Sequence, residues 1–152
     1  MTKRISFANL NLSTTSENKI WAKAKALVER NGFILDGEVS SFEEKFASYC
    51  NADFGIGVGS GCDALLWAME GLGIGKGDEV ITVANTYIGT VLPIIRAGAK
   101  PVLVDCDPIS QQIDPEQVMA AITPHTTAIV AVHLFGRLAP MDELLDIAQK
   151  SG

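Results

Sequence analysis

The sequence contains few of the residues that build disulfide-linked or metal-bound folds. Its three cysteines, Cys50, Cys62 and Cys106, are odd in number and share no Cys-x-x-Cys spacing. The only histidines are His125 and His133. A disulfide framework and a zinc knuckle are therefore not expected, and a metal cluster would have few ligands to use. The sparse cysteines fit a reducing compartment.

Long apolar runs and an excess of positive charge are also missing. No run reaches the roughly 18–20 apolar residues that cross a bilayer, and the N-terminal MTKRISFANLNLSTTSE has no apolar signal core. We therefore expect a soluble, cytoplasmic protein without a membrane partner. Lys and Arg number 12 against 18 Asp and Glu, a net charge of −6. Nucleic acid is not an expected partner, because phosphate contacts need a surface of the opposite sign.

The composition predicts a folded α/β domain. Hydrophobic residues make up 47% of 152 residues, which is too many for a disordered chain. After Asn51, short apolar runs alternate with helical stretches. The expected strands are 54–58, 79–83, 101–105 and 127–134, and the expected helices are 87–97, 115–122 and 141–150, with one more between 58 and 73. Strands that are apolar on both faces and separated by helices predict a mostly parallel sheet with helices on both faces.

Two further helices are expected before this α/β part. Apolar positions share one face over 16–31, and a second helix is predicted from Ser41, where Glu44 completes a capping box. Phe42, Phe46 and Tyr49 follow at helical spacing. This aromatic stripe is expected to face the core, which is the usual role of such a face.

The segment GIGVGSGCDAL indicates a loop that enters a helix. Gly59 and Gly61 allow a close backbone approach and a positive φ. The first amides of the helix, around Gly61, Cys62 and Asp63, form with the helix dipole an anion site that suits a phosphate. The alternative is a glycine-rich turn in which Asp63 only complements the dipole.

Two other phosphate motifs do not fit. A dinucleotide fingerprint needs G-x-G-x-x-G, but Cys62 stands where the third glycine belongs. The next strand ends in Asn85 rather than in the carboxylate that would hold a ribose. No G-x-x-x-x-G-K-[ST] run exists either. NAD and a P-loop nucleotide are therefore not expected.

Tyr87 follows the carboxyl end of the predicted strand 79–83. Ligands bind at that edge of open α/β sheets, so its ring could stack on a flat heteroaromatic ligand. A helix-entry tyrosine packed on a neighbouring loop is the equal alternative.

Four other residues could carry chemistry. Asp105 and Asp107 at a strand end could hold a metal or act on a proton, although a structural turn before Pro108 is the commoner role. His133 is interpreted as a hydrogen-bonded histidine within an apolar strand. Cys62 has no histidine near it in sequence, so its amide is expected to matter more than its thiol.

The ordered segments GVGSGCDALLWAMEGLGIGKGDEVITVANTYIGTV, GAKPVLVDCDP and AITPHTTAIVAVHLFGRLAPM resemble the DegT/DnrJ/EryC1/StrS family. These are pyridoxal-phosphate (PLP) sugar aminotransferases of fold type I, the aspartate aminotransferase type. The resemblance implies an N-terminal lead-in and helix over 1–32 and an incomplete large domain over 33–152. It assigns Ser60, Gly61 and Cys62 to the PLP phosphate and Tyr87 to the pyridine ring.

The resemblance also implies the reaction. An amino group, typically from glutamate, would pass to a keto sugar of a nucleotide diphosphate sugar, in a homodimer that builds each site across its interface. The family's E-D-A-A-[QH] motif and its Schiff-base lysine match no segment here, so the chain is expected to be truncated before both. No catalytic residue is therefore assigned to this chain, which is expected to be inactive alone.

Two alternatives remain open. In the family's dehydratase branch, a histidine replaces the Schiff-base lysine, and that position is not in this sequence. If the chain truly ends at Gly152, it would instead be a non-catalytic PLP-binding or interaction module.

Overall fold

The computed structural model describes residues 11–34 and 36–152. The chain forms two compact units, Met1–Gly57 and Val58–Gly152. Within the described residues, no helix combines the length and the apolar character that crossing a membrane requires. The division expected from the sequence, 1–32 and 33–152, refers to the domains of a full-length family member and stays a prediction.

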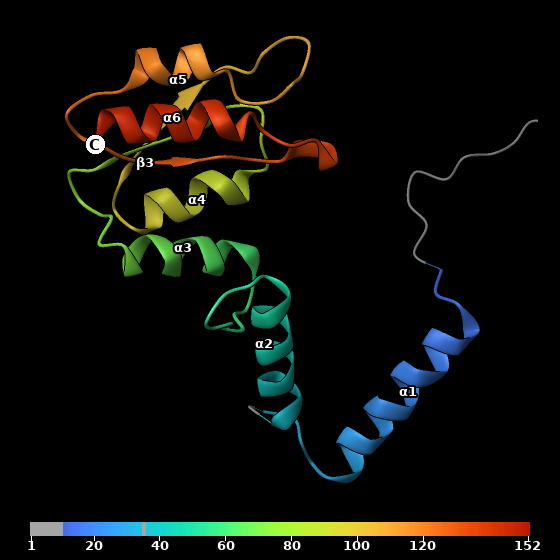
Figure 1. Ribbon diagram of the computed structural model, residues 1–152. Helices are drawn as coiled ribbons and strands as arrows, with labels where there is room; N and C mark the ends of the chain where they lie inside the picture. Colours follow the sequence, from blue (N-terminus) through green and yellow to red (C-terminus); the bar gives the residue numbers. More distant parts are fainter. Residues whose placement is uncertain (1–10, 35) are drawn as a thin grey trace, which may run out of the picture. The chain divides into compact units, whose positions relative to one another are not determined.

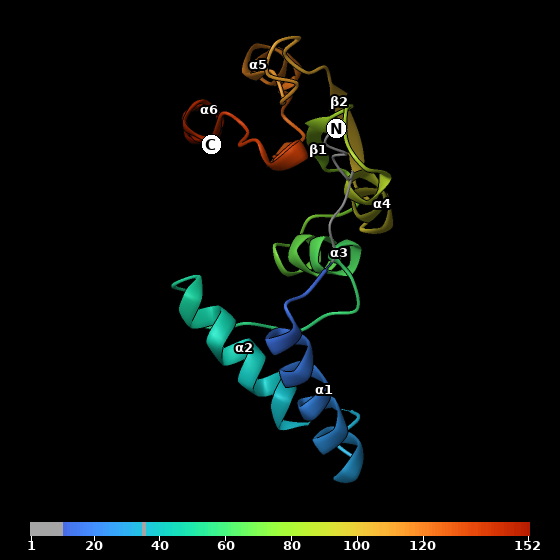
Figure 2. The ribbon, with the colours of Figure 1, turned by 90° about the vertical axis from the view of Figure 1, so that its right-hand side faces the viewer.

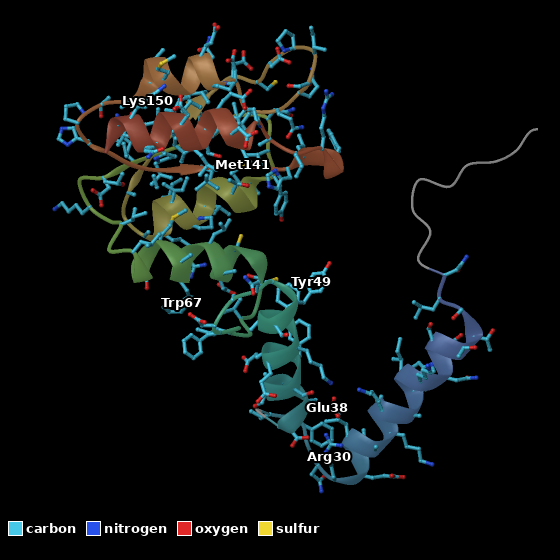
Figure 3. The ribbon with its side chains drawn as sticks, in the orientation of Figure 1. Arg30, Glu38, Tyr49, Trp67, Met141 and Lys150 are labelled. Atoms are coloured by element: carbon cyan, nitrogen blue, oxygen red, sulfur yellow. The ribbon has the colours of Figure 1, made fainter. Side chains whose placement is uncertain are left out.

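The described residues of the first unit form the helices α1 (Thr14–Glu29) and α2 (Gly37–Tyr49). The turn between them carries an ion pair, with Arg30 Nη2 2.6 Å from Asp36 Oδ2 and 3.5 Å from Glu38 Oε1 (Figure 3). Asp36 is the N-cap of α2, so the helix begins four residues before the predicted start at Ser41. The predicted capping box is therefore wrong, because the helix already begins at Gly37, after an Asp36 whose carboxylate pairs with Arg30 and makes no cap hydrogen bond.

The aromatic stripe of α2 does not face a core. Phe42, Phe46 and Tyr49 are 60%, 52% and 86% exposed, and their rings contact one another at centroid distances of 5.5 and 6.3 Å. The buried residue of α2 is Ala47 on another face. The prediction was wrong because helical spacing aligns the rings on one face, but it does not provide an element for that face to pack against.

Residues 54–58 were predicted as a strand but form an irregular segment. The Gly57 amide donates to Glu43 Oε1 at 2.6 Å, so this stretch hydrogen-bonds to an α2 side chain instead of a strand. A Cβ on Gly55 would lie 2.6 Å from the Glu43 carbonyl oxygen, which shows how closely the backbone approaches the helix. Periodicity could not reveal this contact, since an apolar run also suits a segment lying on a helix.

The second unit is built on a parallel sheet of three strands in the order β2-β1-β3. The strands are β1 (Glu79–Val83), β2 (Lys100–Val104) and β3 (Thr126–Val130). Ile81 in β1 is in register with Val102 and with Ile129. All of β1 is buried, as its β-branched sequence predicts for a central strand. The predicted strand 127–134 was too long, because the chain leaves the sheet at Val130.

Helices cover both faces of this sheet, as expected from the sequence (Figures 1 and 2). On one face lie α3 (Gly61–Gly71) and α4 (Ile88–Arg96), and on the other α5 (Pro115–Ala121) and α6 (Met141–Ser151). Each face of the sheet has its own hydrophobic core, and successive residues of β1 point alternately into one core and the other. Val80 packs with Met69 and Ile94, whereas Ile81 and Val83 pack with the apolar residues of the opposite face, which include Val118, Leu144 and Ile147.

A polar contact ties the strands together at the amino end of the sheet. The Glu79 carboxylate is 8% exposed and accepts hydrogen bonds from Lys100 Nζ at 2.7 Å and Thr123 Oγ1 at 2.6 Å. The bond from Lys100, followed by that from Thr123, holds the pKa of Glu79 below its ordinary value. These two hydrogen bonds join β1 to β2 and to the turn before β3. The candidate site lies at the opposite, carboxyl end.

Candidate functional site

The first part of the candidate site is the N-terminus of α3. Ser60 is the N-cap, and its Oγ accepts the Asp63 amide at 3.2 Å and donates to Asp63 Oδ2 at 2.8 Å. The first helical hydrogen bond runs from the Ala64 amide to the Ser60 carbonyl at 2.9 Å. The Gly61 and Cys62 amides precede it and donate to no acceptor within the described part of the chain. These two amides, backed by the helix dipole, can bind an anion.

This geometry corrects two details of the predicted anion site. The Asp63 amide is not free, because the cap Ser60 occupies it. Gly59 and Gly61 do not adopt positive φ, since an extended Ser60 already turns the chain into the helix. A Cβ on Gly61 would meet nothing within 4 Å. Gly61 therefore leaves the surface beside the free amides open, which suits the approach of a phosphate group.

The second part is Tyr87, the residue before the first turn of α4. β1 ends at Val83, so the residues that lead to Tyr87 lie at the carboxyl edge of the sheet. The Tyr87 carbonyl accepts the Thr90 amide at 2.9 Å, while the side chain is 76% exposed. The ring therefore keeps a face available for a flat partner.

Gly89 is where the two parts meet. The Cys62 thiol donates to the Gly89 carbonyl oxygen at 3.4 Å. A Cβ built on Gly89 would lie 2.7 and 2.8 Å from Cε1 and Cδ1 of Tyr87, and 3.0 Å from Cys62 Sγ. The Tyr87 ring and the Cys62 side chain thus both rest against the α-carbon of one glycine. The sequence prediction missed Gly89, because a glycine inside a helical pattern gives no signal of such a contact.

Arg96 is a second residue that the sequence prediction missed. Its Nη1 lies 3.7 Å from Asp63 Oδ1, and the two side chains are 56% and 34% exposed. Helical side chains tilt towards the N-terminus of their helix, which lets Arg96 reach back from the last turn of α4. It offsets the negative charge of Asp63 beside the free amides. The only sequence signal is a basic residue at a helix end, which commonly just complements the dipole.

The remaining candidates belong to turns and do not join the site. Asp105 Oδ1 accepts the amide of Cys106 at 2.8 Å. Asp107 Oδ1 accepts the amides of Ser110 at 2.6 Å and Ile109 at 3.2 Å. These bonds, that of Ser110 foremost, lower the pKa of Asp107. In the described ranges, no three histidines, cysteines or carboxylates come together as metal ligands. The hydrogen bonds from backbone amides support the structural-turn interpretation of both aspartates.

His133 was expected inside a strand, and this placement was wrong. It is exposed and precedes the short helix η1 (Leu134–Gly136), beyond the end of β3. Its Nδ1 accepts the amide of Ala139 at 3.0 Å, so the expected hydrogen bond is present. The bond fixes the loop that leads into α6.

Comparison with known proteins identifies the family. A profile of the DegT/DnrJ/EryC1/StrS aminotransferase family matches residues 14–152. The chain belongs to this family. The dTDP-3-amino-3,4,6-trideoxy-alpha-D-glucose transaminase of Streptomyces venezuelae is 41% identical over 152 residues, which cover 99% of this chain and 40% of that protein. The dTDP-3-amino-3,6-dideoxy-alpha-D-galactopyranose transaminase of Aneurinibacillus thermoaerophilus is 44% identical over 134 residues, 88% of this chain and 37% of that protein.

Solved structures agree with this assignment. DesV of S. venezuelae is 40% identical with a TM-score of 0.82, over 98% of this chain and 40% of that one. NtdA of Bacillus subtilis with bound PMP, the amine form of the cofactor, is 29% identical with a TM-score of 0.86, over 91% of this chain and 32% of that one. The fold is thus part of the PLP fold type I, as the sequence resemblance implied.

The relatives also bear on cofactor and length. Solved structures of family members include PMP-bound and PLP forms, which supports PLP as the cofactor of the family. The chain spans 32% to 42% of the length of the first curated relatives that it matches.

Proposed function

We propose that this chain supplies the phosphate- and ring-binding part of a PLP-dependent aminotransferase that acts on nucleotide-linked keto sugars. One observation carries the proposal: a helix N-terminus with two free amides and an exposed aromatic ring meet over Gly89 at the carboxyl edge of the sheet. The names of the relatives support a sugar bound to a nucleoside diphosphate as the acceptor. Glutamate is the amino donor that we expect from the family resemblance.

The residues present fit PLP. The Gly61 and Cys62 amides would hold the phosphate, with Ser60 fixing the turn that presents them. The Tyr87 ring would lie against the pyridine. When bound, PLP supplies the electron sink that amino-group transfer requires. This chain's own contribution is to bind and orient that group.

We assign no catalytic residue to this chain. Its eight lysines lie outside any segment that matches the family's Schiff-base motif. The lysine and the carboxylate that pairs with the pyridine nitrogen are proposed to lie on the remainder of a full-length family member. A homodimer in the cytoplasm is the assembly and the compartment that we propose for it.

The test uses the full-length protein and the double variant Gly61→Pro/Cys62→Pro, which removes both amides that would hold the phosphate. We expect the wild type to bind PLP and to release 2-oxoglutarate from glutamate in the presence of a nucleotide-linked 3-keto sugar. Tyr87→Ala should weaken PLP binding without unfolding the protein, because the side chain is exposed. Absence of PLP binding by the wild type would refute the proposal. A deoxygenated sugar product without amine transfer would instead identify the dehydratase branch.

A further inference from the structure

We propose that Gly89 is a positioning residue that sets the orientation of the Tyr87 ring. The inference rests on the proposed function for its consequence, because the ring matters there as the platform for PLP. Its structural basis is separate from that function. The α-carbon of Gly89 faces the edge of the ring so closely that an added methyl group would lie 2.7 and 2.8 Å from two ring carbons.

The ring has few other constraints. Tyr87 is 76% exposed, and an exposed side chain normally exchanges between staggered rotamers. At residue 89, the absence of a side chain lets the ring edge settle against the backbone. Dispersion contacts between the ring edge and the backbone of Gly89 favour one ring position over the others. We therefore infer that Gly89 selects the rotamer that the ring adopts.

The same glycine also fixes the distance to the anion site. The Cys62 thiol donates to the Gly89 carbonyl at 3.4 Å and would lie 3.0 Å from an added Cβ. Ring and thiol therefore share one contact surface, which sets the ring position relative to the Gly61 and Cys62 amides. A cofactor that binds both the free amides and the ring needs a constant distance between them.

A methyl group at residue 89 should displace the ring rather than the helix. Gly89 does not have positive φ, so alanine suits its backbone, and alanine has the higher helix propensity. The two nearest atoms belong to a ring that can rotate into solvent, and the third is Cys62 Sγ, which at 3.0 Å has to shift by only a few tenths of an ångström. A role in packing α3 on α4 would predict the opposite, namely a destabilised protein with an unchanged ring.

The first experiment is ¹⁹F NMR of the full-length protein carrying 3-fluorotyrosine, without cofactor. Tyr87→Phe assigns the Tyr87 resonance, and Tyr49→Phe assigns a reference in the other unit. Gly89→Ala should shift or broaden the Tyr87 resonance, leave that of Tyr49 in place and keep the thermal midpoint. The matched control is Gly71→Ala in α3, where an added Cβ meets nothing within 4 Å; it should move neither resonance. An unchanged Tyr87 resonance in Gly89→Ala would overturn the inference.

The second experiment is a double-mutant cycle on PLP affinity. Gly89→Ala should weaken PLP binding by about tenfold or less, the range of one lost offset-stacked ring pair. In the Tyr87→Ala background the same substitution should have no further effect. Equal losses in both backgrounds would show that Gly89 does not act through Tyr87. If the wild type binds no PLP, the proposed function fails, and the ¹⁹F spectra alone decide the inference about Gly89.

Discussion

Ser60 gives the sharpest test of how the α3 terminus is built. Replacing it with alanine removes the oxygen that accepts the Asp63 amide at 3.2 Å and that donates to Asp63 Oδ2 at 2.8 Å. Loss of an N-cap serine costs about 1 kcal/mol, within a range of roughly 0.5–2 kcal/mol. The lost bond to Asp63 Oδ2 should add little, because that carboxylate is partly exposed and water can replace the hydroxyl.

The expected result of Ser60→Ala is a decrease of about 1 kcal/mol in the free energy of unfolding. This corresponds to a thermal midpoint lower by about 2–4 °C in a chain of this size. Urea unfolding should show a lower midpoint with an unchanged slope. Hydrogen exchange of the Asp63 amide should become faster, whereas the Ala64 amide, which bonds to the Ser60 carbonyl, should change less.

Ser60→Asn is the matched control, because asparagine caps helices as well as serine does. It should preserve the midpoint and the slow exchange of the Asp63 amide. If Ser60→Ala left both measurements at their wild-type values, the cap would not hold the terminus. If Ser60→Asn were as damaging as Ser60→Ala, the effect would arise from the shape of the side chain and not from its accepting oxygen.

Three further substitutions, one of them with a matched control, test the sheet, the core and the charge beside the free amides. The pKa of Glu79 is below its ordinary value of 4.5, so the Glu79 carboxylate stabilises the fold above pH 4.5. This stabilisation is lost as the pH falls through the lowered pKa. Between pH 7 and pH 3, the urea midpoint should therefore drop less in Glu79→Gln than in the wild type. Ile94 is 0% exposed, so Ile94→Ala should destabilise by about 2–5 kcal/mol in urea unfolding. Its neighbour Ile95 is 54% exposed, and Ile95→Ala should change stability by less than about 1 kcal/mol. Arg96→Gln removes the ion pair of Asp63 and should weaken PLP binding a few-fold in titrations at low salt, with the difference shrinking at 1 M salt.

Local signals predicted the second unit well. The β-branched run 79–83 forms a strand, as predicted, and the helix predicted over 115–122 is α5, which Asp114 caps through the Glu116 amide with Pro115 in the first turn. These features succeed because each one depends on residues within a few positions of one another. The loop that enters α3 and the position of Tyr87 after a strand end were predictable for the same reason, because each depends on residues that are close in sequence.

The remaining features depend on contacts between distant residues. The contact of Gly57 with Glu43 spans 14 positions, and that of Cys62 with Gly89 spans 27. In the sequence, the segment around Gly57 looks like an ordinary loop, and Gly89 looks like an ordinary glycine in a helix. The aromatic stripe of α2 fails for a related reason: spacing places rings on one face, but only the tertiary structure decides whether that face is covered.

The topology explains why the two halves of the site meet. α3 precedes the central strand β1 and α4 follows it, so in a parallel sheet both helices run antiparallel to β1 and begin at its carboxyl edge. The contact of Cys62 with Gly89 joins their first turns. Beyond their other ends, a Cβ built on Gly75 would lie 3.3 Å from the carbonyl oxygen of Ala97, the C-cap of α4, so these ends also lie close together. Two helix N-termini are thereby brought side by side, and their dipoles add at one place. An anion bound at the first would also be stabilised by the second, which would favour a phosphate over a neutral ligand at this place.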